Sequence, residues 1–320
     1  MVRCPDGAPS PRFPLHPVCK SVSVALSDTL ARHAHREVPM AEFTAEDDGL
    51  PCLEVGAWAE DKYRLVQLYD QLFSTGMKSR WDVRVYIDLY AGPGISRVRR
   101  TSRLFLASPL LALGVLDPFD QHIFCEADEG FRSTLEQRVR KMFPHANARF
   151  IPGDCNDQIE EVCRAIPSPS RERRVLSFCF VDPFDISLRF ATVRRLSSYY
   201  LDFLFLLALH MDANRNIAHY VNPDNSKVDE FLGLPGWRQL WETEERRGTK
   251  FPRFLAEQYS KQMETLGYLA MPWEKMRQVR SSEKNLPLYS LALFSRNRLA
   301  HQFWDQVLYY GSDQLSLPGI

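Results

Sequence analysis

The chain has 320 residues, of which 45% are hydrophobic and 25% charged, a composition typical of a globular protein with one large domain or two. Lysine plus arginine equals aspartate plus glutamate at 40 each, so no net charge draws the whole chain to nucleic acid, and any such binding has to be local. Seven cysteines without a CxxC pair argue against a disulfide framework and a structural zinc site, and no apolar run is long enough to cross a membrane. We therefore expect a reduced, cytoplasmic protein without a metal site or a membrane partner.

Residues 1–50 differ in character from the rest of the chain. The stretch "CPDGAPSPRFPLHP" is rich in proline and has no periodicity, which predicts a disordered N-terminal extension. Met40 opens "MAEFTAEDDGLP", which looks like an ordinary start, so residues 1–39 are expected to have no folded role. Residues 51–320 are expected to form the folded domain.

From Trp58 onward, strands and helices are expected to alternate. Apolar residues recur every three or four positions from Trp58 to Gly76, which predicts a helix. The strands expected after it lie at 83–90, 121–128, 148–157, 175–184 and 201–209. The helices expected between them lie at 108–116, with Ser108 as N-cap, and at 130–143, 158–166 and 189–198.

Five apolar strands separated by short helices predict a parallel sheet covered on both faces, the doubly wound α/β class. Residues 226–270 are helical in pattern and are expected to form an insertion before the last two strands, "EKMRQVRS" and "LPLYSLALFS". A closing helix, "RLAHQFWDQVLYY", follows them. In this class of fold the ligand binds at the carboxyl ends of the strands.

Four successive strands of the expected sheet end in an acidic residue. These residues are Asp88, Glu126, Asp154 and Asp182. A single acid after a strand is unremarkable because loops are polar, but four in succession would place four carboxylates on one rim. Such a rim is a poor place for a triphosphate and suits a ligand that carries a positive charge.

A turn of small residues, "LYAGPG", follows Asp88. Glycines at 92 and 94 allow unusual dihedral angles and a close approach of the backbone to a ligand. The turn is not GxGxxG, because Ala91 and Pro93 interrupt it, which disfavours a Rossmann oxidoreductase, and no GK[ST] follows to make a P-loop. S-adenosylmethionine fits better, since its sulfonium is cationic and its ribose offers hydroxyls.

The stretch "DLYAGPG" resembles the first motif of class I S-adenosylmethionine-dependent methyltransferases. The wider set "WAEDKYRLVQLY", "YIDLYAGPG", "SPLLAL", "FCEAD", "GDCND", "FVDPF" and "PLYSLALFS" resembles the three-Cys-motif partner protein family over roughly residues 55–310. The resemblance implies a Rossmann-like class I methyltransferase sheet in a methyltransferase-like domain over 51–320. It also implies S-adenosyl-L-methionine as cofactor and a genomically linked three-Cys-motif protein as a partner.

The same resemblance implies the cofactor site residue by residue. The methionine end would contact Asp88, Ala91, Gly92 and Gly94, the ribose hydroxyls would contact Glu126, and the adenine amine would contact Asp154 and the backbone of Cys155. For "GDCND" a turn with Asx caps is an equally good interpretation of the residues.

The "DPF" at 182–184 resembles the D-P-P-[YF] motif of methyltransferases that act on exocyclic amines of nucleobases. In that motif polar oxygens accept hydrogen bonds from the target amine and the aromatic ring stacks on the base, which aligns the nitrogen with the methyl group. Asp182, Pro183 and Phe184 are therefore the candidate catalytic residues. The sequence has one proline rather than two, and a helix-starting proline after a strand is the alternative.

Further candidates for substrate binding surround the expected rim. They are Lys62 on the first helix, Arg97, Arg99 and Arg100, with Arg103, in the loop after the glycine turn, and Asn214 and Arg215 after the fifth strand. The arginines would grip phosphates if the loop faces nucleic acid, and otherwise would lie on a solvated loop.

The leading hypothesis is a methyltransferase that acts on an amine of a nucleic-acid base, in single-stranded or looped RNA or DNA. The alternative is a non-catalytic or cofactor-sensing partner protein that uses the methyltransferase fold as a binding module. An intact rim with Asp88, Gly92, Gly94 and Glu126 favours a working cofactor site.

Overall fold

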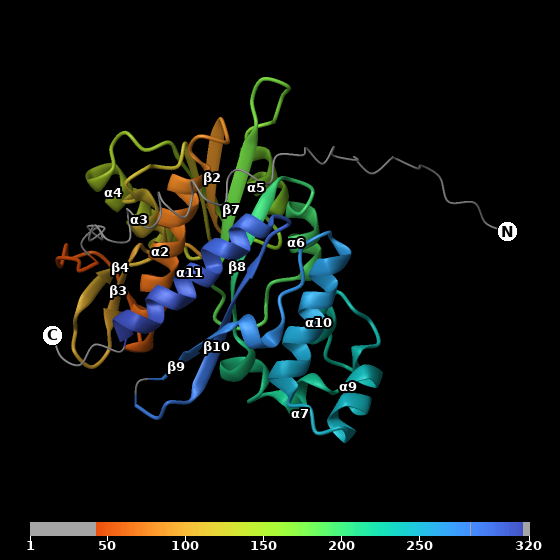
Figure 1. Cartoon of the computed structure of the whole chain (residues 1–320). Coiled ribbons are helices and arrows are strands. Elements are labelled where there is room, and N and C mark those ends of the chain that lie inside the picture. The colour runs from red at the N-terminus through yellow and green to blue at the C-terminus, as the bar shows by residue number, and fades with distance from the viewer. Residues whose placement is uncertain (1–42, 282, 316–320) are drawn as a thin grey trace. The chain divides into compact units, whose positions relative to one another are not determined.

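The computed structural model describes residues 43–281 and 283–315, so the expected extension is described only from residue 43. Within these ranges seven strands form one sheet, in the order β6-β5-β2-β7-β8-β10-β9. The strands are β2 (Val83–Asp88), β5 (Gln121–Glu126), β6 (Ala148–Pro152), β7 (Val175–Val181), β8 (Leu201–Leu207), β9 (Arg277–Arg280) and β10 (Pro287–Phe294) (Figure 1).

The sheet is doubly wound, as the sequence predicts. From β2 the chain adds β5 and β6 on one side and then β7 and β8 on the other, and these five strands are parallel. The order reverses at β2, between β5 and β7. β10 lies antiparallel to both β8 and β9. Strands such as β7 and β8, in which every residue is buried, form because their side chains pack on both faces of the sheet.

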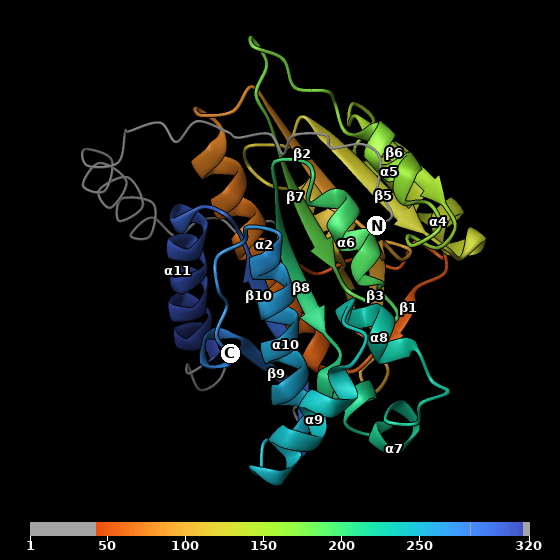
Figure 2. The ribbon, with the colours of Figure 1, turned by 90° about the vertical axis from the view of Figure 1, so that its right-hand side faces the viewer.

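Helices cover both faces. Tyr69 on α2 (Trp58–Met77) packs on Phe178 of β7 at 5.1 Å between ring centroids, and α11 (Arg298–Leu315) packs beside α2. Tyr259 packs on Phe205 of β8 at 5.4 Å. Phe178 pairs in register with Asp202, so Phe205, three positions further on, points to the opposite face. Figure 2 shows α2 and α11 on one side of the sheet and α6 on the other.

The remaining helices between the strands have 6 to 14 residues. They are α3 (Ser108–Leu113), α4 (Glu129–Met142), α5 (Ile159–Ala165) and α6 (Phe190–Leu196). The expectation that Ser108 is the N-cap of its helix is wrong: Ala107 is the N-cap and Ser108 is the first helical residue. Ser108 instead lies beside Asp88, where it lowers the pKa of that carboxyl.

The helical insertion lies between β8 and β9, as the sequence predicts. It consists of η1 (Leu209–Ala213), α7 (Ile217–Tyr220), α8 (Lys227–Leu232), α9 (Trp237–Arg246) and α10 (Phe251–Thr265), with the short helix η2 (Trp273–Lys275) after it. Phe231 of α8 stacks on Tyr259 of α10 at 4.8 Å, and Tyr259 in turn covers β8. The insertion is therefore packed on the sheet.

A second, three-stranded sheet replaces the expected arginine-rich loop. β3 (Ile95–Val98) and β4 (Leu104–Leu106) form an antiparallel hairpin, and β1 (Leu53–Val55) pairs parallel to β3. The segment forms strands rather than a solvated loop because Ile95, Val98 and Phe105 are apolar and their side chains are buried.

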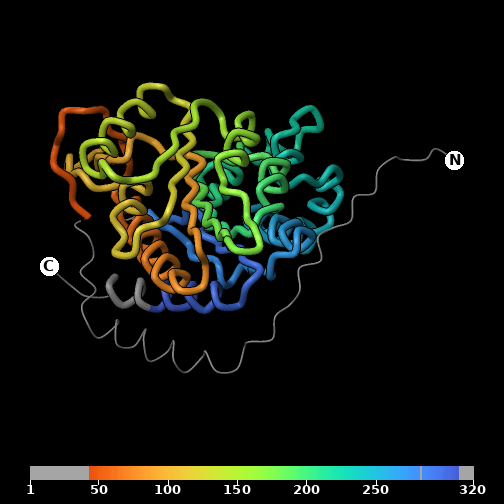
Figure 3. The backbone as a smooth tube through the Cα atoms, turned by 90° about the horizontal axis from the view of Figure 1, so that it is seen from above, coloured from red at the N-terminus to blue at the C-terminus, as the bar shows by residue number. Residues whose placement is uncertain are grey.

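Residues 43–50 pack on this second sheet. Phe43 stacks on Phe105 at 5.2 Å, and the N–H of Ala45 donates to the carbonyl of Leu104 at 3.1 Å. In Figure 3 this red segment, at the start of the described chain, lies beside α4. The part of the expected N-terminal extension that precedes residue 43 lies outside the described residues.

Candidate active site

The four strand-end acids lie along one edge of the large sheet. In the spatial order of the strands they are Asp154 after β6, Glu126 at the end of β5, Asp88 at the end of β2 and Asp182 after β7. Asp88 pairs in register with Phe124 and Phe180, each two residues before the acid that ends its own strand. The parallel strands thus bring together carboxylates that are far apart in the sequence.

The glycine turn lies between Asp88 and Glu126. Gly92 and Gly94 have φ angles of 61° and 85°, values that favour glycine. A Cβ built on Gly92 would meet no atom within 4 Å, whereas one on Gly94 would lie 2.8 Å from Leu135. Gly94 is therefore required for packing, and Gly92 borders open space. The N–H of Ala91 donates to the carbonyl of Cys125 at 3.1 Å, which ties the turn to β5.

Glu126 is held in place by two backbone groups. Its Oε2 accepts from the N–H of Gly92 at 2.7 Å, and its Oε1 accepts from the N–H of Asp128 at 2.8 Å. Asp128 itself caps α4, since its Oδ1 accepts from the N–H of Phe131 at 2.8 Å. Each carboxylate oxygen has a second lone pair, so Glu126 can still accept hydrogen bonds from a ligand.

Asp88 is the most buried carboxyl of the rim. It is 0% exposed, and burial raises its pKa to about 7, against the opposing effect of hydrogen bonds from Ser108 and from the N–H of Tyr90. The neighbouring carboxylates Asp182 and Glu126 raise the pKa further. A positively charged ligand beside Asp88 would reverse this shift, because it would favour the ionised form.

The segment "GDCND", expected to contact the adenine amine, is more exposed to solvent than Asp88. Asp154 is exposed, and its Oδ1 accepts from the N–H of Asn156 at 2.7 Å. This is an Asx cap, the alternative interpretation of "GDCND" given above. Cys155 is buried beside Tyr90, and burial raises the pKa of its thiol to about 12. Cys155 therefore stays protonated, and its backbone is the part that a ligand can use.

Asp182 forms an ion pair with Lys62. The Nζ of Lys62 lies 2.5 Å from Oδ2 of Asp182, with side-chain exposures of 4% and 12%. The hydroxyl of Tyr63 also donates to Oδ2, at 3.3 Å, and the Lys62 ammonium lies over the ring of Tyr63 at 3.9 Å and over that of Trp58 at 5.5 Å. Lys62, expected as a contact for substrate, is thus fixed against the candidate catalytic carboxylate.

The two residues after Asp182 differ sharply in exposure. Pro183 is buried, whereas the ring of Phe184 is 70% exposed. The loop that presents this ring is anchored on its far side, where Asp185 pairs with Lys227 of α8 at 2.6 Å. An exposed ring on such a loop could stack on a planar group at little cost in conformational entropy.

One further acid at the rim was missed by the sequence analysis. Asp212 of η1 is buried, and its carboxylate accepts from the N–H of Ile186 at 3.0 Å and from the hydroxyl of Tyr220 at 2.7 Å. It therefore fixes the loop that follows Phe184. The sequence does contain a signal for Asp212: it lies in "HMDA", which directly follows the fifth apolar strand, just as the other four acids follow their own strands.

The arginine cluster is compensated by polar groups of this chain. Arg97 pairs with Asp47 at 3.2 Å, Arg99 donates to the carbonyl of Glu54 at 3.3 Å, Arg100 pairs with Glu283 at 2.8 Å, and Arg103 pairs with Glu60. Asn214 and Arg215 follow η1 and are exposed. The hairpin therefore presents fewer uncompensated positive charges than its sequence suggests.

No group of three or more His, Cys, Asp or Glu side chains could hold a metal ion within 43–281 and 283–315. No helix in this part of the chain is both long and apolar enough to span a bilayer.

Together the strand order of the large sheet and its reversal beside β2 define a doubly wound, Rossmann-like α/β fold. The structure is similar to the O-methyltransferase TomG from Streptomyces achromogenes in complex with SAM, with 13% identity, 86% of this chain and 96% of that chain covered, and a TM-score of 0.38. It is also similar to magnesium protoporphyrin IX methyltransferase from Synechocystis PCC 6803 with bound SAH, with 12% identity, 86% and 98% covered, and a TM-score of 0.38.

The strand order and the parallel pairing of β6, β5, β2, β7 and β8 identify the fold by themselves. No family model matches the sequence, and no curated protein matches it. The resemblance to the three-Cys-motif partner protein family therefore stays a prediction.

Proposed function

We propose that this protein is an S-adenosylmethionine-dependent methyltransferase that acts on an amine of a nucleic-acid base. The observation that supports the cofactor best is the rim between Glu126 and Asp88. There the glycine turn borders open space at Gly92, and a buried carboxyl with a pKa of about 7 lies next to it. A cationic ligand with a ribose fits this combination, because the acid beside the turn can balance its charge and Glu126 can bind its hydroxyls.

The residues present fit the cofactor at each of its ends. Those assigned to the methionine end are Asp88, Ala91, Gly92 and Gly94, Glu126 is assigned to the ribose, and Asp154 with the backbone of Cys155 is assigned to the adenine amine. When bound, the cofactor supplies a methyl group on a positively charged sulfur. The protein has to bind this group, exclude water from it and hold the acceptor in line with it.

Asp182 is assigned to the acceptor. It follows β7, which neighbours the strand that carries Asp88, and its Oδ2 is oriented by Lys62 and Tyr63. A carboxylate held in this way can accept a hydrogen bond from an amine and orient the nitrogen lone pair. The exposed ring of Phe184, two residues further on, supports a planar acceptor such as a nucleobase.

A pair of glycine substitutions tests the cofactor. Gly92 and Gly248 both have positive φ, and a Cβ on either would meet nothing within 4 Å, but Gly248 follows α9, far along the chain from the rim. Gly92→Val should weaken S-adenosylhomocysteine binding at least about tenfold in calorimetry, whereas Gly248→Val, with comparable backbone strain, should leave it unchanged. Tight NAD binding without any response to S-adenosylhomocysteine would contradict the assignment.

Transfer of a tritiated methyl group to total RNA, DNA and protein from one cell tests the acceptor. Asp182→Asn should abolish the label and change cofactor affinity by less than about twofold, because this side chain is assigned to the acceptor alone. Label in protein alone would contradict the nucleic-acid assignment. Cofactor binding without label in any pool would favour a cofactor-sensing partner protein instead.

A further inference from the structure

Arg138 of α4 is a buried charge outside the set of residues assigned to cofactor or acceptor. It is 1% exposed, although arginine is among the residues that are least often buried. A buried guanidinium is tolerated only where its donors are satisfied. The partners of Arg138 therefore show which parts of the chain it is built to hold.

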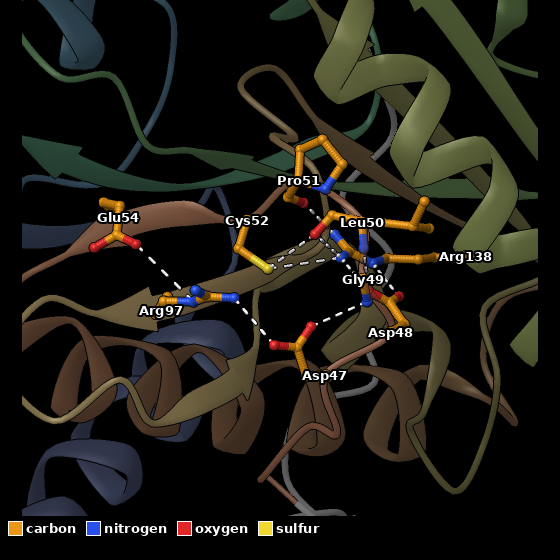
Figure 4. Close-up of polar contacts among 9 residues, drawn as sticks. All are labelled: Asp47, Asp48, Gly49, Leu50, Pro51, Cys52, Glu54, Arg97 and Arg138. Atoms are coloured by element: carbon orange, nitrogen blue, oxygen red, sulfur yellow. Dashed lines mark hydrogen bonds and ion pairs between the residues drawn. The ribbon is translucent and has the colours of Figure 1, made fainter.

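These partners belong to two segments that are separate in the sequence. Asp48 receives two parallel hydrogen bonds, from Nε and Nη2 of Arg138, each at 2.8 Å, and the carbonyl of Pro51 accepts from Nη1 at 2.9 Å. The carbonyl of Pro93, in the glycine turn, also accepts from Nη1, at 2.7 Å. Figure 4 shows Asp48, Leu50 and Pro51 gathered around the Arg138 guanidinium.

The contact to Pro93 completes a set of constraints on the glycine turn. The N–H of Gly92 donates to Glu126, and the carbonyl of the next residue accepts from Arg138. Leu135, one helical turn before Arg138, fills the space in which a Cβ of Gly94 would lie. One dipeptide is thus held at its donor end by the ribose-assigned acid and at its acceptor end by Arg138.

We propose that Arg138, oriented by Asp48, is a positioning residue that sets the glycine turn for the cofactor. This inference rests on the proposed function in so far as the turn binds S-adenosylmethionine. It assigns a role to residues 48–52, whose acceptors for the guanidinium are Asp48, the carbonyls of Leu50 and Pro51, and the sulfur of Cys52. Without Arg138 the carbonyl of Pro93 loses its charged donor, and the turn exchanges among conformations of which few fit the cofactor.

The test compares two buried arginines. Arg84 is 8% exposed and donates to the carbonyls of Ser74 and Pro118 at 2.9 and 2.8 Å, but it lies near the start of β2, at the opposite end of the strand from Asp88. Arg138→Gln, Asp48→Ala and Arg84→Gln are each examined by peptide-level hydrogen exchange over residues 88–96 and by calorimetry with S-adenosylhomocysteine. Asp48→Ala keeps the test usable if Arg138→Gln does not fold, since Asp48 lies at the edge of the cluster with 20% of its side chain exposed.

We expect faster exchange over 88–96 and at least about tenfold weaker binding in Arg138→Gln, with a smaller change of both in Asp48→Ala. Arg84→Gln should lower the melting temperature by a similar amount and leave both readouts unchanged. Unchanged exchange over the turn in Arg138→Gln, or equal effects of the two arginine variants, would overturn the inference. If the wild-type protein does not bind S-adenosylhomocysteine, the cofactor assignment fails, and the exchange comparison still decides whether Arg138 sets the turn.

Discussion

Among single residues, Asp88 should make cofactor binding depend on pH, because its burial raises its pKa. Its pKa of about 7 means that the carboxyl is largely protonated at pH 6 and ionised at pH 8. A cationic ligand requires the ionised form, so at pH 6 binding has to release a proton. S-adenosylmethionine affinity should therefore fall as the pH is lowered from about 8 to 6.

Calorimetry across that pH range, in buffers of different ionisation enthalpy, measures both the fall in affinity and the proton release. Asp88→Asn should bind more weakly and lose the pH dependence. Asp202 is the matched control, since burial also raises its pKa to about 7, but it lies near the start of β8. Asp202→Asn should retain the wild-type pH dependence of binding, and its loss there would contradict the role of Asp88.

The ion pair between Lys62 and Asp182 should contribute to the stability of the folded protein. Because both side chains are nearly buried, removing one partner leaves an uncompensated charge, and Lys62→Met should lower the free energy of unfolding by about 3–5 kcal/mol. Lys62→Met combined with Asp182→Leu should recover much of this loss. Denaturant unfolding of the two single variants and the double variant measures the coupling.

The pair of Lys78 and Asp117 is the control for that cycle. Its lysine is 61% exposed, so the same pair of substitutions should show a coupling of only about 0–1 kcal/mol. Equal coupling in the two cycles would mean that Lys62 and Asp182 gain nothing from their burial.

At the scale of elements, the β3–β4 hairpin decides whether the arginines contact nucleic acid. Arg100 and its partner Glu283 are 77% and 52% exposed, and such surface pairs are weak enough for a phosphate to replace the carboxylate. If Arg99 and Arg100 both contact phosphates, replacing both with alanine should reduce the slope of log affinity against log salt by about two.

Fluorescence anisotropy with labelled single-stranded RNA at several salt concentrations measures this slope. Arg171 and Arg173 provide a matched pair, because they are exposed and lie in the loop that precedes β7, at the edge of the sheet opposite Asp182. Replacing them with alanine should leave the slope unchanged. An equal reduction in both double variants would point to nonspecific attraction, and no reduction in either would remove the hairpin from the interface.

For the whole molecule, the structure bears on where the folded domain begins. We propose that the domain includes the residues from Phe43, because Phe43 covers Phe105 and Asp48 neutralises Arg138. A chain that starts at Met40 should melt within about two degrees of the full-length chain, since the composition of residues 1–39 predicts no folded core.

A chain that starts at Leu53 should melt lower by about 10 °C, because it leaves the Arg138 charge buried without its carboxylate. Scanning calorimetry of the three chains makes the comparison. A large loss already at Met40 would show that residues before it stabilise the domain. No loss at Leu53 would show that Asp48 and Phe43 contribute little.

The large sheet and its rim could be predicted from the sequence because their signals are local. The strands β2, β5, β6, β7 and β8 are each recognisable as a short segment rich in apolar residues. Asp88, Glu126, Asp154 and Asp182 each end one of the first four of these segments. The carboxyl ends of parallel strands lie at one edge of the sheet. The position of each acid at the end of its own strand was therefore sufficient to predict that all four carboxylates lie along that edge.

The partners of those residues were decided by the tertiary structure alone. Lys62 and Asp182 are 120 residues apart, and Arg138 and Asp48 are 90 apart, with no periodic pattern that relates either pair. Such contacts depend on how α2 and α4 pack. Until that packing is known, any residue of opposite charge is an equally good candidate for the partner of Asp182 or Arg138. The sequence by itself determined that Asp88, Glu126, Asp154 and Asp182 share one rim, because each of them ends an apolar strand. Only the tertiary structure decided which of them are buried and held by an opposite charge, because burial and pairing depend on distances that the order of residues does not contain.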